Sequence, residues 1–293
     1  MHRTGAHPAL LPSAAVAICG AIWGCYWYPL RWLEAAGLGG AWVSVIFFAT
    51  TALSPIPWMF NRAAWQGFRQ NFAGGALLGL AFTLYTVSLL LTDVIDAILL
   101  FYLTPVWSTL AGLALFGERL TPQRLIAIAL GFAGMAFILG FDNGLPMPSR
   151  SGDWLALVSG MIWAAGTMRS VRKPSSSIML PVLSFSGGGL IASLGVAIIA
   201  MRADSSLATF SNPEAVMPWA IIIALLVFVP PNFLVLWAAQ RLDSGRVGIL
   251  LMTEVLAGAI TAALLSGEAF GAMEITGTLL IAGAGLIEVF GRR

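Results

Sequence analysis

Glu254 is the residue whose chemistry stands out most, because it is an ionisable side chain inside an apolar run. The run extends from Val247 to Leu265 and holds no other charged residue. A carboxyl group at such a depth is costly and usually faces a cavity or a polar partner. Glu254 could exchange protons, pair with the ammonium group of a bound molecule, or be hydrogen-bonded to a neighbouring helix in a structural role.

Other patterns that carry chemistry are missing from the sequence. The two histidines, His2 and His7, lie in the N-terminal tail, and no cluster of residues has the spacing of metal ligands. No glycine-rich phosphate loop follows a strand. Cys19 and Cys25 fall on one predicted helix, too far apart along its axis to form a disulfide. We therefore expect no catalytic residue, no metal and no cofactor, and we do not expect an enzyme.

The composition predicts that the chain is surrounded by lipid. Hydrophobic residues make up 59% of the 293 residues, charged residues make up 10%, and the mean hydropathy is +0.89. Soluble domains carry about 25% charged residues, so this chain cannot cover a water-facing surface. The net charge of +2 is too small to indicate nucleic-acid binding.

The apolar segments predict an all-α integral membrane protein with ten transmembrane helices. About 20 apolar residues are needed to cross the hydrocarbon core. The predicted spans are residues 12–30, 40–60, 71–91, 95–115, 122–140, 153–169, 177–201, 217–239, 246–265 and 271–290.

The basic residues predict that both termini are cytoplasmic. With the N-terminus inside, the cytoplasmic segments hold every Lys and Arg except Arg31, Arg150 and Arg202, which is 12 of the 15. The reverse orientation would invert the usual excess of positive charge on the inner side.

Two halves of the chain resemble each other. Phe116-Gly117-Glu118 is echoed by Ser266-Gly267-Glu268, and Gly20-Ala21-Ile22-Trp23 by Gly160-Met161-Ile162-Trp163. Five spans per half is an odd number, so the second repeat must be inverted, which is typical of carriers that work by alternating access. We predict a first repeat at 1–140, an outer connecting loop at 141–152 and a second, inverted repeat at 153–293. Glu118 and Glu268, at span ends, are expected to anchor helix ends and loops, or alternatively to act in gating.

These motifs resemble the EamA-type modules of the drug/metabolite transporter superfamily. The similarity rests on Leu103-Thr104-Pro105 followed by Gly117-Glu118-Arg119-Leu120-Thr121, and on Glu254 followed by Gly267-Glu268. Val255 stands where that family often has proline, so we expect a straighter ninth helix. Asp142-Asn143-Gly144-Leu145 and Ile162-Trp163-Ala164-Ala165 resemble the aromatic amino acid exporters known as YddG. The resemblance covers residues 14–290. It implies export of aromatic and other neutral amino acids across a bacterial inner membrane, without ATP or metal.

The resemblance also implies where a substrate would bind. In the superfamily, the first, third, fourth, sixth, eighth and ninth helices surround a central cavity. An amino acid needs an apolar pocket and a few polar groups, and aromatic faces attract an ammonium group. Tryptophans near span ends, such as Trp27, are expected instead in the interfacial belts. The predicted substrate-binding residues are Trp23, Tyr26, Tyr85, Tyr102, Trp107, Trp163, Asn232 and Glu254.

Prolines within the fourth and eighth spans are candidate hinges. Pro105, Pro230 and Pro231 interrupt the backbone hydrogen bonds of these helices. Bending at these positions would let a gate open. The alternative is that they have no such role, because membrane helices commonly tolerate proline.

Several alternatives remain open from the sequence. A single deep carboxylate among aromatic residues would also suit an exporter of drugs or small cationic metabolites. A channel would need a continuous polar lining, and most spans offer one polar residue or none near mid-depth. A carrier of sugar phosphates would need a basic residue at mid-span, which is missing. One chain carries both halves, so no obligatory protein partner is expected, and the energy coupling is not encoded in any motif.

Overall fold

The computed structural model describes residues 10–54, 56, 68–116, 121–139, 147–171, 178–239, 241–242, 244–268 and 270–290. The regular elements in these ranges are helices joined by turns and short irregular segments, and the only β-type pairing there is an isolated bridge between Leu38 and Phe210. Both chain termini lie outside the described residues, as do residues 141–146 of the predicted outer loop at 141–152, and Glu118.

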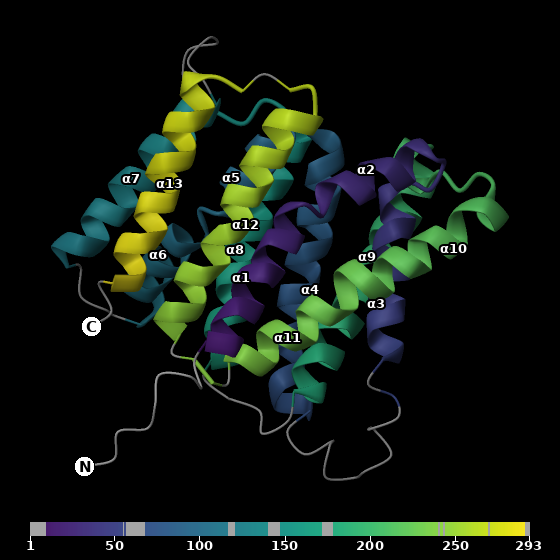
Figure 1. Ribbon diagram of the computed structural model, residues 1–293, viewed down its shortest axis with the longest axis horizontal. Coiled ribbons are helices and arrows are strands. Elements are labelled where there is room, and N and C mark those ends of the chain that lie inside the picture. Colours follow the sequence, from purple (N-terminus) through teal and green to yellow (C-terminus); the bar gives the residue numbers. More distant parts are fainter. Residues whose placement is uncertain are drawn as a thin grey trace.

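The first half of the chain begins with two helices that are separated by a short break and ends with an unbroken helix (Figure 1). They are α1 (Leu10–Gly24), α2 (Trp27–Ala35), α3 (Gly40–Leu53), α4 (Phe68–Leu91), α5 (Val94–Phe101), α6 (Thr104–Phe116) and α7 (Pro122–Leu139). The predicted first span is therefore interrupted at Cys25 and Tyr26, and it continues to Ala35. The aromatic residues at 23, 26 and 27 consequently do not share one unbroken helix.

The second half contains longer continuous helices and one π-helical segment. Its elements are α8 (Ser151–Val171), α9 (Met179–Arg202), the short 3-10 turn η3 (Ser206–Ala208), α10 (Pro213–Ile223), the π-helix η4 (Ala224–Phe228), α11 (Val229–Ala239), α12 (Ser244–Leu265) and α13 (Ala272–Phe290). The α12 helix runs through Val255 without a break, as expected from the valine at the proline position.

Among the residues that the structure describes, five helical segments are long and apolar enough to cross a membrane. They are Leu10–Ala35, Phe72–Leu91, Val94–Ala114, Met179–Arg202 and Pro213–Val235, and shorter apolar helices lie at Gly40–Leu53, Leu125–Ile138, Leu250–Leu265 and Ala272–Ile287. In the described part of the chain the regular elements are all helices, and several are apolar in the way a membrane protein requires, while the count of ten spans and the orientation of the termini stay predictions.

The helices pack in pairs that bring the two halves together. α4 packs against α8 and α9, α1 against α12, α7 against α13, and α3 against α9. Figure 1 shows α7 and α13 side by side at one end of the molecule, with α1 and α12 near its centre and α3, α9 and α10 at the other end. Every one of these contacts joins an element of the first half to an element of the second.

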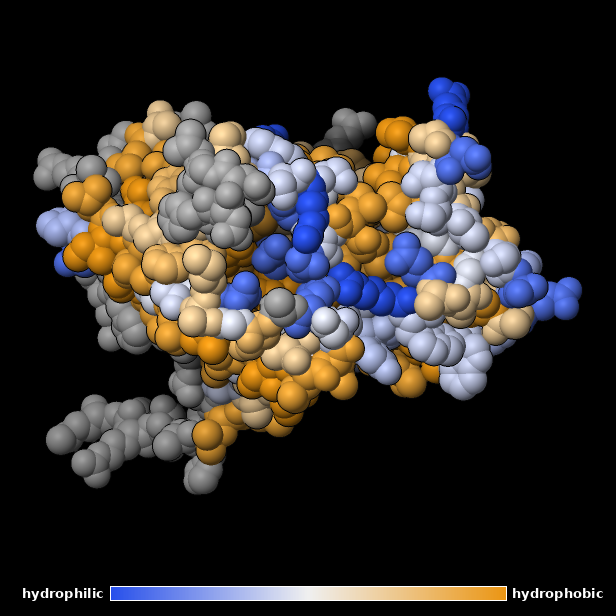
Figure 2. All heavy atoms as spheres, turned by 90° about the horizontal axis from the view of Figure 1, so that it is seen from above, coloured by the Kyte–Doolittle hydropathy of each residue, from blue (hydrophilic) through white to orange (hydrophobic). Residues whose placement is uncertain are grey.

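The surface fits a lipid environment. Apolar side chains are widely exposed on the outside of the bundle, including Ile191, Leu226, Leu264 and Leu279. Seen from above, one end of the molecule carries a band of hydrophilic residues across its middle, with hydrophobic surface on both sides (Figure 2). Burial of the remaining apolar side chains between helices forms one large core that includes residues of both halves.

Candidate functional site

Glu254 is paired with Tyr102 in the middle of the bundle. The Tyr102 hydroxyl donates a hydrogen bond of 2.6 Å to Oε2 of Glu254, and it also lies 3.3 Å from the carbonyl oxygen of Leu251. Glu254 is only 7% exposed. The two partners are 152 positions apart, on α12 and at the break between α5 and α6. This contact brings two predicted site residues together and joins the two halves of the chain.

Phe101 contacts three of the predicted site residues. Its ring stacks on Tyr85 with centroids 4.5 Å apart, and it meets Trp163 edge-on at 5.6 Å and Tyr102 at 5.7 Å. Sequence reasoning did not select Phe101, because a phenylalanine within an apolar segment carries no distinguishing signal. Aromatic faces in this arrangement can hold an apolar side chain or attract a cation beside the Glu254 carboxyl group.

The backbone break beside this cluster has a local cause. Pro105 lacks an N–H, so the carbonyl of Phe101, four residues earlier, cannot receive its helical hydrogen bond. The Thr104 hydroxyl donates to that carbonyl instead, at 2.7 Å. The helix ends at Phe101 and restarts at Thr104, with Tyr102 at the break.

Two glycines place the neighbouring helices close to this region. Gly20 of α1 packs against Thr253 and the Leu251 carbonyl of α12, so tightly that a side chain there would collide with the Thr253 hydroxyl. Gly160 of α8 packs against α5, where an added Cβ would lie 2.8 Å from the Phe101 carbonyl oxygen. The echoed glycines of the sequence therefore make equivalent close helix crossings.

Trp23 and Trp107 hold unused hydrogen-bond donors. Among the described residues, both indole nitrogens are buried and have no hydrogen-bond partner. The same is true of the Ser184 hydroxyl. An unpaired buried donor costs free energy, so these N–H groups are available to a polar ligand. The Trp107 ring packs on Phe132 of α7, with centroids 5.8 Å apart.

Tyr26 and Asn232 meet at a different point, around Phe228. Tyr26 is 2% exposed, its hydroxyl lies 3.3 Å from that of Thr86, and its ring packs on Phe228. The Asn232 amide donates to the Phe228 carbonyl at 2.6 Å. No described contact joins either residue to Glu254 directly. Phe228 ends the π-helical segment η4, which immediately precedes Pro230 and Pro231, the two predicted hinge positions that lack an N–H.

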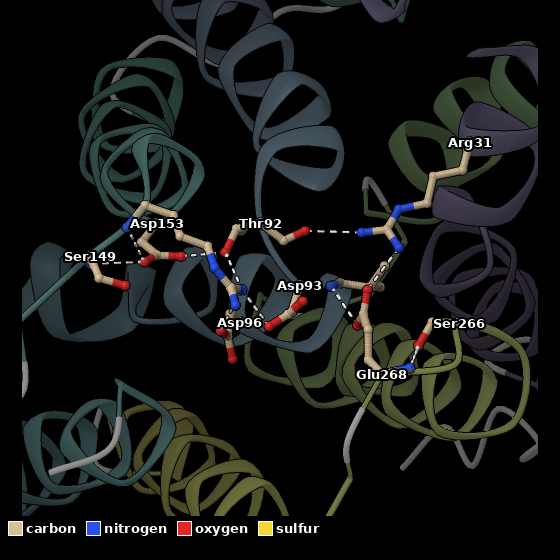
Figure 3. Close-up of polar contacts among 10 residues, drawn as sticks. Arg31, Thr92, Asp93, Asp96, Ser149, Asp153, Ser266 and Glu268 are labelled. Carbon is tan, nitrogen blue, oxygen red and sulfur yellow. Dashed lines mark hydrogen bonds and ion pairs between the residues drawn. The ribbon is translucent and has the colours of Figure 1, made fainter. Parts of the chain in front are cut away.

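A second polar site lies where several helices end, and Figure 3 shows it. Arg31 of α2 donates to Oε1 of Glu268 at 2.7 Å, to the Leu89 carbonyl at 3.0 Å and to the Thr92 carbonyl at 2.9 Å. The other carboxylate oxygen of Glu268 accepts the N–H of Val94, the first residue of α5, at 2.8 Å. Glu268 thus links the chain after α12 to α2 and to the start of α5, and whether it acts as an anchor or in gating stays a prediction.

The chain after α12 is shaped to present Glu268. Gly267 adopts a positive φ of 74°, which glycine accepts without strain and which commonly ends a helix. The Ser266 hydroxyl accepts the N–H of Glu268 at 3.1 Å and fixes the turn.

A neighbouring network on the same end is built around Arg150. It pairs with Asp93 and lies 3.9 Å from Asp96, while Asp153 accepts the Thr92 hydroxyl and the N–H groups of Ser149 and Arg150 (Figure 3). The hydrogen bond from Arg150 to Asp93 raises the pKa of the guanidinium further above its ordinary value, so Arg150 is always charged.

Trp27 corrects one sequence-based expectation. It was predicted to lie in an interfacial belt, but it is 2% exposed, and its indole N–H donates to the Thr261 hydroxyl of α12 at 3.0 Å. The prediction was wrong because α2 continues to Ala35, which draws Trp27 into the bundle. Trp32 and Trp219, two other tryptophans near the ends of predicted spans, are about half exposed and pack edge-to-face on each other.

Two grooves on the bundle are apolar and lie away from the Glu254 pair. One has a volume of ≈ 500 Å³ and lies between α4, α8 and α9, with Arg169 at its edge. The other, ≈ 450 Å³, lies between α1 and α11 and includes Trp237. Neither groove is lined by a predicted substrate-binding residue. Within the described residues, no group of three or more His, Cys, Asp or Glu side chains could hold a metal ion.

Comparison with known proteins gives a consistent result. The sequence model of the EamA-like transporter family matches residues 10–140 and again residues 150–288. The chain is 27% identical over 224 residues to "Uncharacterized transporter PA0485" of Pseudomonas aeruginosa, covering 72% of this chain and 70% of that protein. A crystal structure described only as that of a protein has a TM-score of 0.58 and 17% identity, covering 94% of this chain and 96% of its own, which shows a shared fold.

Proposed function

Because this chain belongs to the EamA-like transporter family, and is therefore a multi-pass membrane transporter, we propose that it exports neutral and aromatic amino acids from the bacterial cytoplasm by alternating access. The proposed exporter lies in the inner membrane and resembles the YddG exporters in its substrates. Because the family carries out transport, we propose a transporter and not a membrane enzyme.

The buried pair of Glu254 and Tyr102 is the observation that carries this proposal. Glu254 has no cationic partner among its described contacts, so it can receive the ammonium group of a substrate. The rings of Tyr85, Phe101 and Trp163 lie next to the pair and suit an apolar or aromatic side chain. The unpaired indole N–H groups of Trp23 and Trp107 are donors of the kind that a substrate carboxylate needs.

The internal symmetry of the contacts supports alternating access. We propose two inverted repeats of five spans each, at 1–140 and 153–293, with both termini cytoplasmic. The family model matches the chain twice, and α1 crosses α12 as α8 crosses α5, each through an echoed glycine. Two such halves can exchange conformations, so that each face opens in turn.

A second candidate function is export of lipophilic cations. The carboxyl group of Glu254 among aromatic rings favours it, because this combination also binds drug-like cations. The two functions differ in whether a substrate carboxylate is required.

Transport into proteoliposomes tests the proposal. Labelled tryptophan, phenylalanine, alanine and threonine would be compared with a lipophilic cation and a sugar phosphate. We expect saturable flux of the amino acids, and Trp163→Ala should reduce it at least tenfold. Trp219→Phe, at an exposed ring, is the matched control and should transport like the wild type. Flux of the cation alone would establish the second candidate instead.

The same assay with and without a pH gradient tests energy coupling at Glu254. If Glu254 carries protons, the gradient accelerates wild-type flux and has no effect on Glu254→Gln. If Glu254 receives only the substrate ammonium group, Glu254→Gln raises the KM and the gradient changes neither protein. If the Glu254→Gln variant has the KM and the gradient response of the wild type, Glu254 has only a structural role.

A further inference from the structure

Arg31 joins three segments that are distant in sequence. It lies on α2, and its guanidinium contacts the carbonyls of Leu89 and Thr92 at the α4–α5 turn as well as Glu268 beyond α12. A planar guanidinium that satisfies three acceptors at once holds these segments in one arrangement. The Arg31 side chain is 30% exposed and that of Glu268 12%, so the pair is neither sealed in the core nor free on the surface.

The pair closes a line of contacts that runs along α12 from Glu254. Gly24 packs against the Glu254 carbonyl and the backbone of Gly258, then Trp27 donates to Thr261, and then Arg31 meets Glu268. Between Glu254 and this end of the molecule, α1 and α2 therefore cover α12 at each step. This face of α12 becomes accessible only if α2 moves away from the end of α12.

The Arg150 network lies on the same end and shares Thr92 with the Arg31 contacts. Arg150 precedes α8 and contacts Asp93 and Asp96 at the start of α5, and it donates to the Thr92 hydroxyl at 3.4 Å. α5 and α8 also pack against each other through Gly160. Arg150 therefore secures two helices that are already in contact and does not reach α2 or α12.

From these contacts we propose that Arg31 and Glu268 form a latch that closes this end of the transporter, and that the pair must separate in each transport cycle. The proposal rests on the proposed function, because it assumes alternating access. Arg31 and Glu268 are positioning residues: they set the relative population of the closed and open states, and they do not bind the substrate at Glu254. By the charge distribution, this end is the outer one.

A distance measurement across the latch tests this directly. Spin labels at Ala35→Cys and Ala272→Cys, both exposed and on either side of the pair, would be introduced with Cys19→Ala and Cys25→Ala. Without substrate, we expect one short distance to dominate. Glu268→Gln should raise the population of a longer distance at least fivefold. The glutamine keeps an oxygen for the Val94 N–H but loses the charge attraction to Arg31.

Two further variants separate a latch from a simple stabilising contact. Arg31→Gln should raise the long-distance population as Glu268→Gln does, whereas Arg150→Gln should leave the distances unchanged. With substrate, both latch variants should lower the maximal transport rate at least threefold and leave the KM near the wild-type value, because binding at Glu254 is intact.

The outcomes distinguish a latch from a structural anchor. Unchanged distances and unchanged maximal rates in both latch variants, with only a lower melting temperature, would overturn the latch and leave a structural anchor. The distance measurement needs no substrate, so it stands even if the transported compounds are not amino acids. A failure of the proposed function would instead appear as amino acid flux missing from a protein whose distances respond.

Discussion

The two helix crossings beside the candidate site have similar glycine contacts, but the residues that follow these contacts differ. α1 crosses α12 at Gly20, and α8 crosses the α5–α6 pair at Gly160. The carbonyls they approach belong to Leu251 and Phe101, which are 150 positions apart, like Glu268 and Glu118. Each crossing is close because glycine lets the backbones touch. Each half of the chain therefore supplies one glycine to a close crossing with the other half.

The difference lies in the next few residues. In the first half, Thr104 and Pro105 break the helix, and the Thr104 hydroxyl satisfies the carbonyl that proline leaves unpaired. In the second half, the matching positions hold Glu254 and Val255, and α12 is continuous. One copy thus supplies a bend that presents Tyr102, and the other supplies a straight helix that presents the carboxyl group paired with it. The polar pair therefore joins a residue at the bend of one half to a residue on the straight helix of the other.

Exchanging the proline between the halves should produce the largest effect. Val255→Pro removes the N–H that helical geometry directs to the Leu251 carbonyl in a buried part of α12. We expect it to lower the free energy of unfolding by about 3 kcal/mol. Thermal unfolding in detergent, followed by tryptophan fluorescence, measures this.

The reverse exchange is the matched control. Pro105→Ala should change stability much less, because alanine only restores an N–H, but it should straighten the bend at Tyr102 and slow transport. Equal destabilisation by both variants would mean that the bend at Pro105 contributes as much to stability as the continuous α12 does.

Replacing a glycine by alanine in each of the two helix contacts shows which contact is packed more closely. At Gly24 of α1, an added Cβ would collide with the Glu254 carbonyl and lie 2.7 Å from the Gly258 nitrogen, and backbone atoms cannot move aside. We expect Gly24→Ala to cost about 2 kcal/mol, and Gly160→Ala about 1 kcal/mol. The same unfolding assay ranks them.

Gly187→Ala controls for the effect of alanine on helix propensity. Nothing lies within 4 Å of an added Cβ there, so this variant should be as stable as the wild type or slightly more stable. A loss at Gly187 as large as at Gly24 would contradict the crowding explanation.

Hydroxyl removal probes the two polar contacts that distinguish the halves. Tyr102→Phe leaves the buried carboxyl group of Glu254 without its donor, at an expected cost of about 1.5 kcal/mol. Thr104→Val leaves the Phe101 carbonyl unpaired and should cost about 1 kcal/mol. Only Tyr102→Phe should also raise the KM for transport. An equal rise in KM with Thr104→Val would show that the bend, and not the Tyr102 hydroxyl, determines substrate binding.

The smallest effect is expected at Arg150. Its side chain and that of Asp93 are 49% and 43% exposed, so solvent screens the ion pair. Arg150→Gln should change the free energy of unfolding by about 0.5 kcal/mol. Added salt should reduce the difference between this variant and the wild type, and a loss of several kcal/mol would mean that the network holds α5 and α8 together.

The sequence alone determined features that depend on neighbouring residues or on composition. The low share of charged residues required a lipid environment, and the missing N–H of Pro105 predicted an interruption where α5 ends. Val255 predicted the continuous α12, and the echoed glycines at 20 and 160 indicated related halves. Each follows from a local rule, because a backbone donor is present or absent whatever the rest of the chain does. The role of the predicted site residues in substrate binding stays a prediction.

The tertiary structure decided which distant residues meet. Arg31 and Glu268 are 237 positions apart, and nothing near either residue in the sequence marks the other as its partner. Phe101 lies at the centre of the aromatic cluster, and Trp27 is buried in the core. Tyr26 and Asn232 both contact Phe228. The physical reason is that these contacts depend on which helices pack together and how each is rotated about its axis. That arrangement is a property of the whole bundle, and no single segment encodes it.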